Sequence, residues 1–243
     1  MATGDLMRVF VLSSADDGRT WSAPREITGS VKRPDWTWYA TGPGRGIQLS
    51  KGRKKGRLLI PCNHEEAATR NNASHVIWSD DHGKTWVLGG IAQDSTNEST
   101  LAELSNGHLL LNMRNTGRSR HRQIAFSSNA GKRFSPAAPD SVLVEPVCEG
   151  NLIGFRASGG RYCLAFSNPA SATARVDMTV RVSYDDGRTW PLQKLLYEGP
   201  SAYSCLTVLP DGRLSCLYEA GRQRPYEGIV FRKINWEELT SKP

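Results

Sequence analysis

Residues 183–190 read SYDDGRTW, and near copies of this octapeptide occur at two other places in the chain. These copies are SADDGRTW at 14–21 and SDDHGKTW at 79–86, so all three share the pattern Ser-x-Asp-x-Gly-x-Thr-Trp. A degenerate fourth copy, SSNAGKRF, lies at 127–134. Successive copies are about 50–65 residues apart, close to the ~40–50 residues of one four-stranded propeller blade. The repeat therefore predicts a β-propeller.

Each position of the repeat has a local task in a turn. Asp and Ser side chains can bond the turn backbone, Gly supplies a positive φ, and Trp can pack between blades. We therefore interpret Asp16, Asp81, Asn129 and Asp185 as structural residues. The acidic cluster at 80–82 predicts no metal site, because neighbouring side chains point to opposite sides of a strand or into a turn.

The rest of the chain also has an all-β pattern. Short apolar segments at 7–12, 57–61, 75–78 and 108–112 recur between Gly, Asn or Asp turns. Helical periodicity is nearly absent, and only 235–239 resembles a helical turn. We therefore predict a single all-β domain over residues 1–243.

The charge of the chain limits its possible binding partners only in part. The net charge of +7 favours anionic partners without choosing among an acidic sugar, a nucleic acid and a charged surface. The basic run at 51–57 lacks aromatic residues and lies between two strand-like segments, which favours a solvated hairpin turn over a nucleic-acid patch. We expect no nucleic-acid partner.

The chain has no apolar run long enough for a membrane span, and we expect it to be soluble. Residues 1–5 do not resemble a secretory signal. The compartment stays open, because a leader preceding these residues would allow secretion or a lysosome-like location.

The five cysteines form an odd set without a Cys-x-x-Cys pair. Each lies in or beside an apolar strand-like run, which is typical of buried free thiols. These residues are Cys62, Cys148, Cys163, Cys205 and Cys216.

The repeat is the Asp-box, and with further segments it makes nearly the whole chain resemble the sialidase (neuraminidase) family. The matching segments are KRPDWTWYATGPG at 32–44, NEST at 97–100, NMRN at 112–115, RVDMTVRVS at 175–183, SAYS at 201–204 and LYE at 217–219. The resemblance implies a six-bladed β-propeller. It also implies an exo-α-sialidase, which hydrolyses terminal α-linked sialic acid from glycans, glycoproteins or glycolipids with retention and without a cofactor.

The family's nucleophile is a tyrosine assisted by a glutamate, and sialidases are an exception among retaining glycosidases. Sialic acid carries a carboxylate on its anomeric carbon, so a neutral phenol avoids the repulsion that a carboxylate nucleophile would meet. The resemblance makes Tyr203 the nucleophile and Glu98 its base. Tyr203 could instead be a packed strand-end aromatic. Glu103 could compete with Glu98, but the Asn-Glu-Ser-Thr context favours Glu98.

The family also binds the substrate carboxylate with three arginines, whose planar forks bind a carboxylate bidentately. Arg114 and Arg175 match the second and third. Arg181 lies six residues after Arg175 on the same strand face, so it stays an alternative for the third position.

An aromatic segment is expected near the glycerol or N-acyl group of the sugar. Its candidates for the rim are Asp35, Trp36, Trp38 and Tyr39. Aromatic residues beside Pro and Gly could equally be packed in a loop.

Two groups of the family pattern are absent from these residues. No Phe/Tyr-Arg-Ile-Pro motif, which carries the first arginine, occurs in the sequence. The acid aspartate should precede a strand that resembles residues 4–6, so it would lie before residue 1, and Asp5 is more consistent with a structural role. We therefore expect a propeller incomplete at its N-terminus, without most of its first blade.

An incomplete ring has consequences for both stability and function. Open sheet edges invite association. Two other functions remain open: a propeller that binds sialic acid or another glycan without catalysis, and an Asp-box scaffold for protein interactions.

Overall fold

The computed structural model describes residues 7–157 and 159–240, and nearly all of its regular structure is β-strand. Two short helices, α1 (Thr28–Val31) and α2 (Trp236–Thr240), are the exceptions. The strands are β1 (Phe10–Val11), β2 (Arg25–Glu26), β3 (Trp36–Thr41), β4 (Ile47–Gln48), β5 (Leu58–Glu66), β6 (Asn72–Ser79), β7 (Val87–Asp94), β8 (Thr96–Glu103), β9 (Leu109–Asn115), β10 (His121–Ser127), β11 (Ala138–Val144), β12 (Asn151–Arg156), β13 (Tyr162–Pro169), β14 (Val176–Ser183), β15 (Leu192–Val208), β16 (Leu214–Ala220) and β17 (Gly228–Ile234).

The strands form antiparallel sheets in chain order, as a propeller requires. The strand orders are β1-β2, β3-β5-β6-β7 with β4 also on β5, β8 to β11, and β12 to β17. The last sheet divides within β15, whose first half pairs with β14 and whose second half pairs with β16. The described residues thus contain three complete four-stranded blades and parts of two more.

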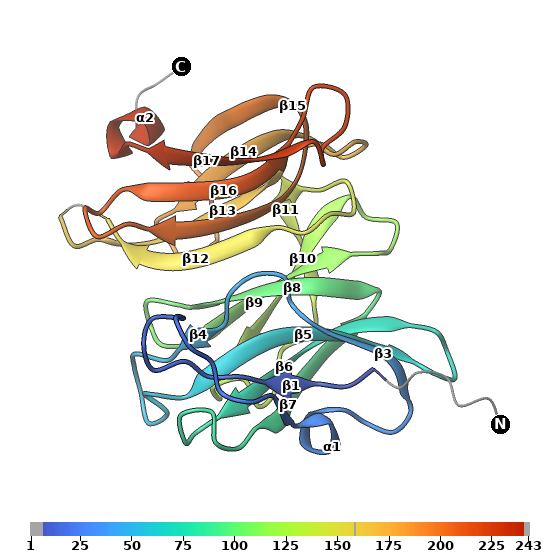
Figure 1. The fold of residues 1–243 in the computed structure, drawn as a ribbon. Coiled ribbons are helices and arrows are strands. Elements are labelled where there is room, and N and C mark those ends of the chain that lie inside the picture. Colours follow the sequence, from blue (N-terminus) through green and yellow to red (C-terminus); the bar gives the residue numbers. More distant parts are fainter. Residues whose placement is uncertain (1–6, 158, 241–243) are drawn as a thin grey trace.

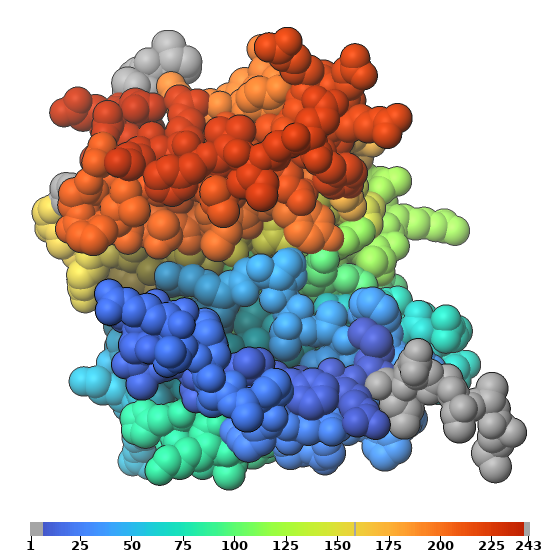
Figure 2. All heavy atoms as spheres, viewed as in Figure 1, coloured from blue at the N-terminus to red at the C-terminus, as the bar shows by residue number. Residues whose placement is uncertain are grey.

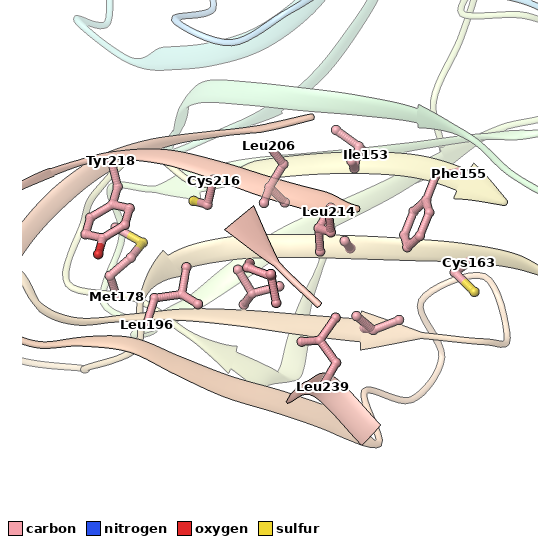
Figure 3. Packing of buried hydrophobic residues seen from close by; sticks show 14 of the residues in the cluster. Ile153, Phe155, Cys163, Met178, Leu196, Leu206, Leu214, Cys216, Tyr218 and Leu239 are labelled. Carbon is pink, nitrogen blue, oxygen red and sulfur yellow. The ribbon is translucent and has the colours of Figure 1, made fainter. Parts of the chain in front are cut away.

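The sheets lie side by side, and β8 and β12, the first strands of successive blades, are neighbours near the middle of the molecule (Figure 1). β8 contacts both β5 and β12, and β12 in turn contacts β15. Apolar side chains fill the space between neighbouring sheets. Between the last two blades, Ile153, Met178, Leu206 and Leu214 are all buried together (Figure 3). Removing this apolar area from water holds the sheets together at about 25 cal/mol per Å².

Each of the four Asp-box turns connects two consecutive strands, and all four share one local geometry. In the last box, Asp185 accepts hydrogen bonds from the Thr189 amide at 2.9 Å and from the Thr189 hydroxyl at 2.7 Å. Asp81 and Asp16 accept the same two bonds from Thr85 and Thr20. The threonine bonds hold the pKa of Asp16 and of Asp81 at about 2, so both stay charged.

The backbone of each box is equally regular. The residue before the glycine and the glycine itself both have positive φ, as at Asp186 (61°) and Gly187 (86°). The degenerate box at 127–134, which is the third in chain order, keeps this turn, because Asn129 still accepts the Arg133 amide at 2.9 Å. It has arginine in place of threonine, so it lacks the hydroxyl hydrogen bond of the other boxes.

The box tryptophans differ in burial. Trp86 and Trp190 are buried, whereas Trp21 is 61% exposed. The expectation that this tryptophan packs between blades is therefore wrong for Trp21. Its sheet has only β1 and β2 among the described residues, so no neighbouring strand covers the ring.

The basic run at 51–57 is a turn between β4 and β5, with positive φ at Gly52 and Gly56. The interpretation of this run as solvated is wrong for its last residue, Arg57. Arg57 is buried, with its Nε 2.7 Å from Asp80 and its guanidinium 3.9 Å from the centre of the Trp78 ring. This arginine anchors the turn to the second Asp-box.

The cysteine prediction is confirmed. All five are free thiols, four of them buried and Cys205 partly so. The helical turn expected at 235–239 is confirmed by α2. Asp5 lies outside the described residues.

Candidate active site

Residues of three strands, β8, β9 and β15, come together in space although β15 is distant from the other two in sequence. Glu98 lies near the start of β8, Arg114 near the end of its neighbour β9, and Tyr203 in the second half of β15. The Tyr203 hydroxyl donates to Glu98 Oε1 at 2.5 Å. We call these three residues the Tyr203 cluster.

The environment keeps the Tyr203 phenol protonated. Burial raises its pKa above the ordinary tyrosine value, and the hydrogen bond and negative charge of Glu98 raise it further. The positive charge of Arg114 opposes this effect but does not outweigh it. The phenol can therefore become nucleophilic only as its proton passes to a base, and the Glu98 carboxylate is in hydrogen-bond contact with that proton.

Arg114 links the two other members of the cluster. Its Nη1 lies 2.7 Å from Glu98 Oε2 and 3.4 Å from the Tyr203 hydroxyl oxygen. Its Nε is buried without a hydrogen-bond partner in the described structure. The guanidinium is thus held by one carboxylate and retains donors for a second anion.

Arg175 lies beside the Tyr203 cluster, just before β14. Its guanidinium is 5.9 Å from the centre of the Tyr203 ring. The Tyr226 hydroxyl at 2.6 Å and the Val147 carbonyl at 3.1 Å accept its hydrogen bonds. No carboxylate among the described residues is within ion-pair distance, so its charge is available to an anionic ligand.

The two alternatives left open by the sequence differ in position. Arg181 is buried farther along β14 and donates to Asn168 at 3.2 Å, and no contact joins it to Tyr203. Six strand residues separate the two arginines by about 20 Å. Glu103, at the far end of β8, accepts the Ser50 and Lys51 amides. The geometry therefore brings Arg175 and Glu98 to Tyr203, and leaves Arg181 and Glu103 elsewhere.

The aromatic segment proposed for the rim of the site contains both buried and exposed residues. Trp36 and Tyr39 are buried, so the expectation that they line a sugar site is wrong. Trp36 stacks on His64 at 3.6 Å, and the Tyr39 hydroxyl lies 3.5 Å from Cys62 Sγ. An irregular register between Trp36 and Trp38 breaks the usual alternation and exposes Trp38.

Trp38 is the aromatic rim candidate that faces open space. It lines a cavity of about 500 Å³ together with Asn97, the residue before Glu98. Asp35 is exposed in the turn before β3, where its carbonyl accepts the Ala67 amide.

Three residues around the cluster were not given roles from the sequence. Glu219 accepts the Tyr203 amide at 3.1 Å, Glu149 accepts the Ser204 amide at 2.9 Å, and Tyr226 holds Arg175. The only sequence feature that pointed to Glu219 is its place in the segment 217–219, which resembles the sialidase family. Nothing in the local sequence distinguishes Glu149 or Tyr226, because their contacts lie on other strands.

Two further searches cover the part of the chain that the structure describes. Within residues 7–157 and 159–240, no group of three or more His, Cys, Asp or Glu residues is arranged to hold a metal ion. No helix in these ranges is long and apolar enough to cross a membrane.

The fold and the site define an Asp-box β-propeller with a tyrosine–glutamate pair flanked by arginines. Residues 2–216 match the family model for the BNR repeat-like domain. The chain belongs to the sialidase family and carries its BNR repeat-like domain. Its propeller architecture matches that of solved sialidases over a partial region.

Individual relatives agree with this assignment. The chain is 38% identical to a sialidase of Micromonospora viridifaciens over 240 residues, which cover 96% of this chain and 36% of that protein. It is 36% identical to a sialidase of Bacteroides fragilis, covering 88% of this chain and 39% of the relative. The solved structure of Hadza microbial sialidase Hz136 superposes with a TM-score of 0.85 at 35% identity, covering 96% of this chain and 45% of that one. The chain thus spans less than half the length of each of these relatives.

Proposed function

We propose that this chain contributes the catalytic tyrosine of an exo-α-sialidase, which releases terminal α-linked sialic acid from glycoconjugates with retention of configuration. The observation that carries the proposal is the 2.5 Å hydrogen bond from the Tyr203 hydroxyl to Glu98, beside Arg114. Homology to exo-α-sialidases, which are glycoside hydrolases, supports the reaction class.

The proposed reaction has two displacement steps. In the first, the Tyr203 oxygen attacks the anomeric carbon while Glu98 takes the phenolic proton, and the bond to the leaving group breaks as the leaving oxygen takes a proton from the solvent. In the second, water attacks the same carbon and gives a proton back to the solvent, while the tyrosine oxygen leaves and recovers its own proton from Glu98. Two inversions retain the configuration.

Arg114 and Arg175 are assigned to the carboxylate of the sugar. Both guanidinium groups lie close to Tyr203, and each has nitrogen atoms that can face a second anion. Arg175 is the better placed for this task, because no carboxylate in the described ranges neutralises it. Trp38 is the rim residue assigned to the uncharged part of the substrate.

No residue of the described chain is assigned as the acid that protonates the leaving group, so the choice of substrate matters in a test. A methylumbelliferyl α-sialoside has an acidic leaving group that needs little protonation. We expect the purified chain to release the fluorophore and expect Tyr203→Phe to reduce the rate at least 100-fold. Tyr184→Phe is the matched control, since Tyr184 packs against Arg161 and Trp236 away from the site.

Each outcome decides between functions. Equal turnover by Tyr203→Phe and the unsubstituted chain would rule out the tyrosine mechanism. Binding of the sialoside by a folded chain without turnover would indicate a glycan-binding propeller. A folded chain that neither binds nor cleaves any sialoside would favour an interaction scaffold.

A further inference from the structure

Glu149 is a buried carboxyl group directly behind Tyr203. It lies just before β12, in a segment where Val147 has a φ of 56°, an unusual conformation for a β-branched residue. Its side chain is 4% exposed, and it forms part of the wall of a small cavity of about 150 Å³ together with Tyr203 and Ser204. A carboxyl group in such a place needs an explanation, because burying it as an ion is costly.

The contacts of Glu149 suggest what it does. The pairing of β15 with β16 is irregular between Ser201 and Ser204, so the strand bulges at Tyr203. Within this bulge, the Tyr203 amide donates to Glu219 Oε2 at 3.1 Å and the Ser204 amide donates to Glu149 Oε2 at 2.9 Å. Two side-chain carboxyls thus accept the amide hydrogen bonds at the bulge that directs the Tyr203 phenol toward Glu98.

The charges around Glu149 do not favour its ionised form. The nearby cation Arg122, on β10, is already paired with Glu145 at 2.7 Å. Glu98 on β8 and Glu219 on β16 add negative charge, and the thiols Cys205 and Cys216 face the same carboxyl. No cation of the described residues is within ion-pair distance of Glu149.

The acidity of Glu149 agrees with this geometry. Burial raises its pKa to about 8, the charges of Glu98 and Glu219 act in the same direction, and the Ser204 amide and Arg122 only partly oppose them. At neutral pH the carboxyl therefore carries a proton. Above about pH 8 it becomes the third carboxylate around Tyr203.

We propose that Glu149 is a positioning residue that supports the Tyr203 bulge, and that the site works only while this carboxyl carries its proton. An ionised Glu149 would oppose the negative charge that develops on the Tyr203 oxygen as it loses its proton, and would repel the carboxylate of an anionic sugar. This inference rests on the proposed function, because it assumes that the Tyr203–Glu98 pair is the working pair.

The first test needs no sialoside. The protein is labelled with 3-fluorotyrosine, and the ¹⁹F resonance of Tyr203 is assigned as the one missing from Tyr203→Phe. We expect this resonance to shift with a midpoint near pH 8 in the unsubstituted protein and to stay constant in Glu149→Gln, which keeps a neutral acceptor for the Ser204 amide. Glu103→Gln is the matched control, because Glu103 lies at the other end of β8, and it should retain the shift.

Two results would overturn the inference. One is a Tyr203 resonance that does not move between pH 6.5 and 9.5 in the unsubstituted protein, which needs no variant to fold. The other is a shift that persists in Glu149→Gln, which would assign the titration to the phenol or to another carboxyl.

Turnover supplies the functional half of the test. From pH 7 to 9.5 we expect kcat/KM for the methylumbelliferyl sialoside to fall about tenfold or more in the unsubstituted chain, and to change less than twofold in Glu149→Gln. A parallel fall in both proteins would overturn the protonation requirement. If the chain has no turnover at all, the proposed function fails, while the ¹⁹F titration still decides the role of Glu149.

Discussion

At the scale of single residues, opposing electrostatic effects meet on the Tyr203 phenol. Burial and Glu98 favour the neutral phenol, whereas Arg114, 3.4 Å from its oxygen, favours the phenolate. The neutral form is favoured, so the Tyr203 phenol stays protonated in the resting site; in the proposed reaction it loses its proton to Glu98 only when a substrate is bound. Arg114 also forms an ion pair with Glu98. Its positive charge lowers the energy of a phenolate at Tyr203, but burial and Glu98 outweigh this effect, so the phenol is neutral in the resting site.

Replacing Arg175 tests the carboxylate assignment. Lysine keeps the charge but loses the planar fork and the bond to Tyr226, so Arg175→Lys is expected to weaken sialic acid binding about 10–100-fold, or about 1.5–3 kcal/mol. Calorimetric titration with N-acetylneuraminic acid measures this loss. Arg181→Lys is the control, and weaker binding there, with Arg175→Lys unaffected, would transfer the role to Arg181.

At the scale of secondary structure elements, polar side chains fix the turns and the strand pairs. Each Asp-box closes with bonds from residue i to residue i+4, so it forms from its own sequence. Longer-range polar contacts then attach these turns to their neighbours. Arg57 joins the β4–β5 turn to Asp80 of the second box and to the Ala130 carbonyl of the third.

The contribution of Arg57 can be separated from that of the basic run around it. Arg57→Gln removes a buried guanidinium with an ion pair to Asp80 and is expected to lower the free energy of unfolding by about 2–4 kcal/mol. Arg53→Gln, an exposed change in the same turn, should cost less than about 0.5 kcal/mol. Urea denaturation of both variants measures the difference, and equal stabilities would show that the whole run is solvated.

The strand pair β5–β6 contains two buried histidines that make stability depend on pH. Their Nδ1 atoms are 3.0 Å apart. Burial, with a smaller contribution from the charge of Arg33, lowers the pKa of His64 to about 4. Burial and the neighbouring His64 place the pKa of His75 well below its ordinary value.

The sign of the pH effect follows from these lowered values. The unfolded chain binds protons at both histidines below about pH 6.5, and the folded chain does not, so acidification favours unfolding. Between pH 7 and 5 we expect a loss of about 2–4 kcal/mol, measured by urea denaturation. A His64→Gln, His75→Gln double variant should lose less over this range than the exposed control His108→Gln. An equal loss would assign the effect to the carboxylates.

At the scale of the whole molecule, the blades form an arc whose two ends carry open sheet surface in the described ranges. The edge strand β17 presents Ile229 and Phe231, 73% and 51% exposed, next to Leu217 on β16. The other end presents Phe10 and Trp21. Figure 2 shows the space-filling surface with the first strands and the last strands on opposite sides of the molecule. An exposed apolar edge strand can pair with another chain.

This edge predicts self-association of the chain. We expect the sedimentation coefficient to rise with protein concentration, and we expect the double variant Ile229→Lys, Phe231→Glu to stay monomeric in analytical ultracentrifugation. Val142→Lys, on the outer strand β11, is the control and should leave the association unchanged. A monomer at every concentration of the unsubstituted chain would contradict the prediction.

Much of this architecture could be read from the sequence because it is encoded locally. The Asp-box bonds span four residues, and short apolar segments between turns predicted strands that became parts of β5, β6 and β9. The prediction failed where neighbouring strands decide burial. Sequence alone does not show the burial of Arg57 within a basic run, or of Trp36 and Tyr39 within an aromatic segment. It does not show the exposure of Trp21 within an intact box either.

The sequence by itself determined the propeller class, the family and the identity of the candidate nucleophile and base. Only the tertiary structure decided that Tyr203 and Glu98 touch, that Arg175 rather than Arg181 lies beside them, and that Glu149 supports the bulge behind them. The physical reason is that strand periodicity assigns a side chain to one face of a sheet. What faces it there depends on how strands distant in the chain pack around the common centre.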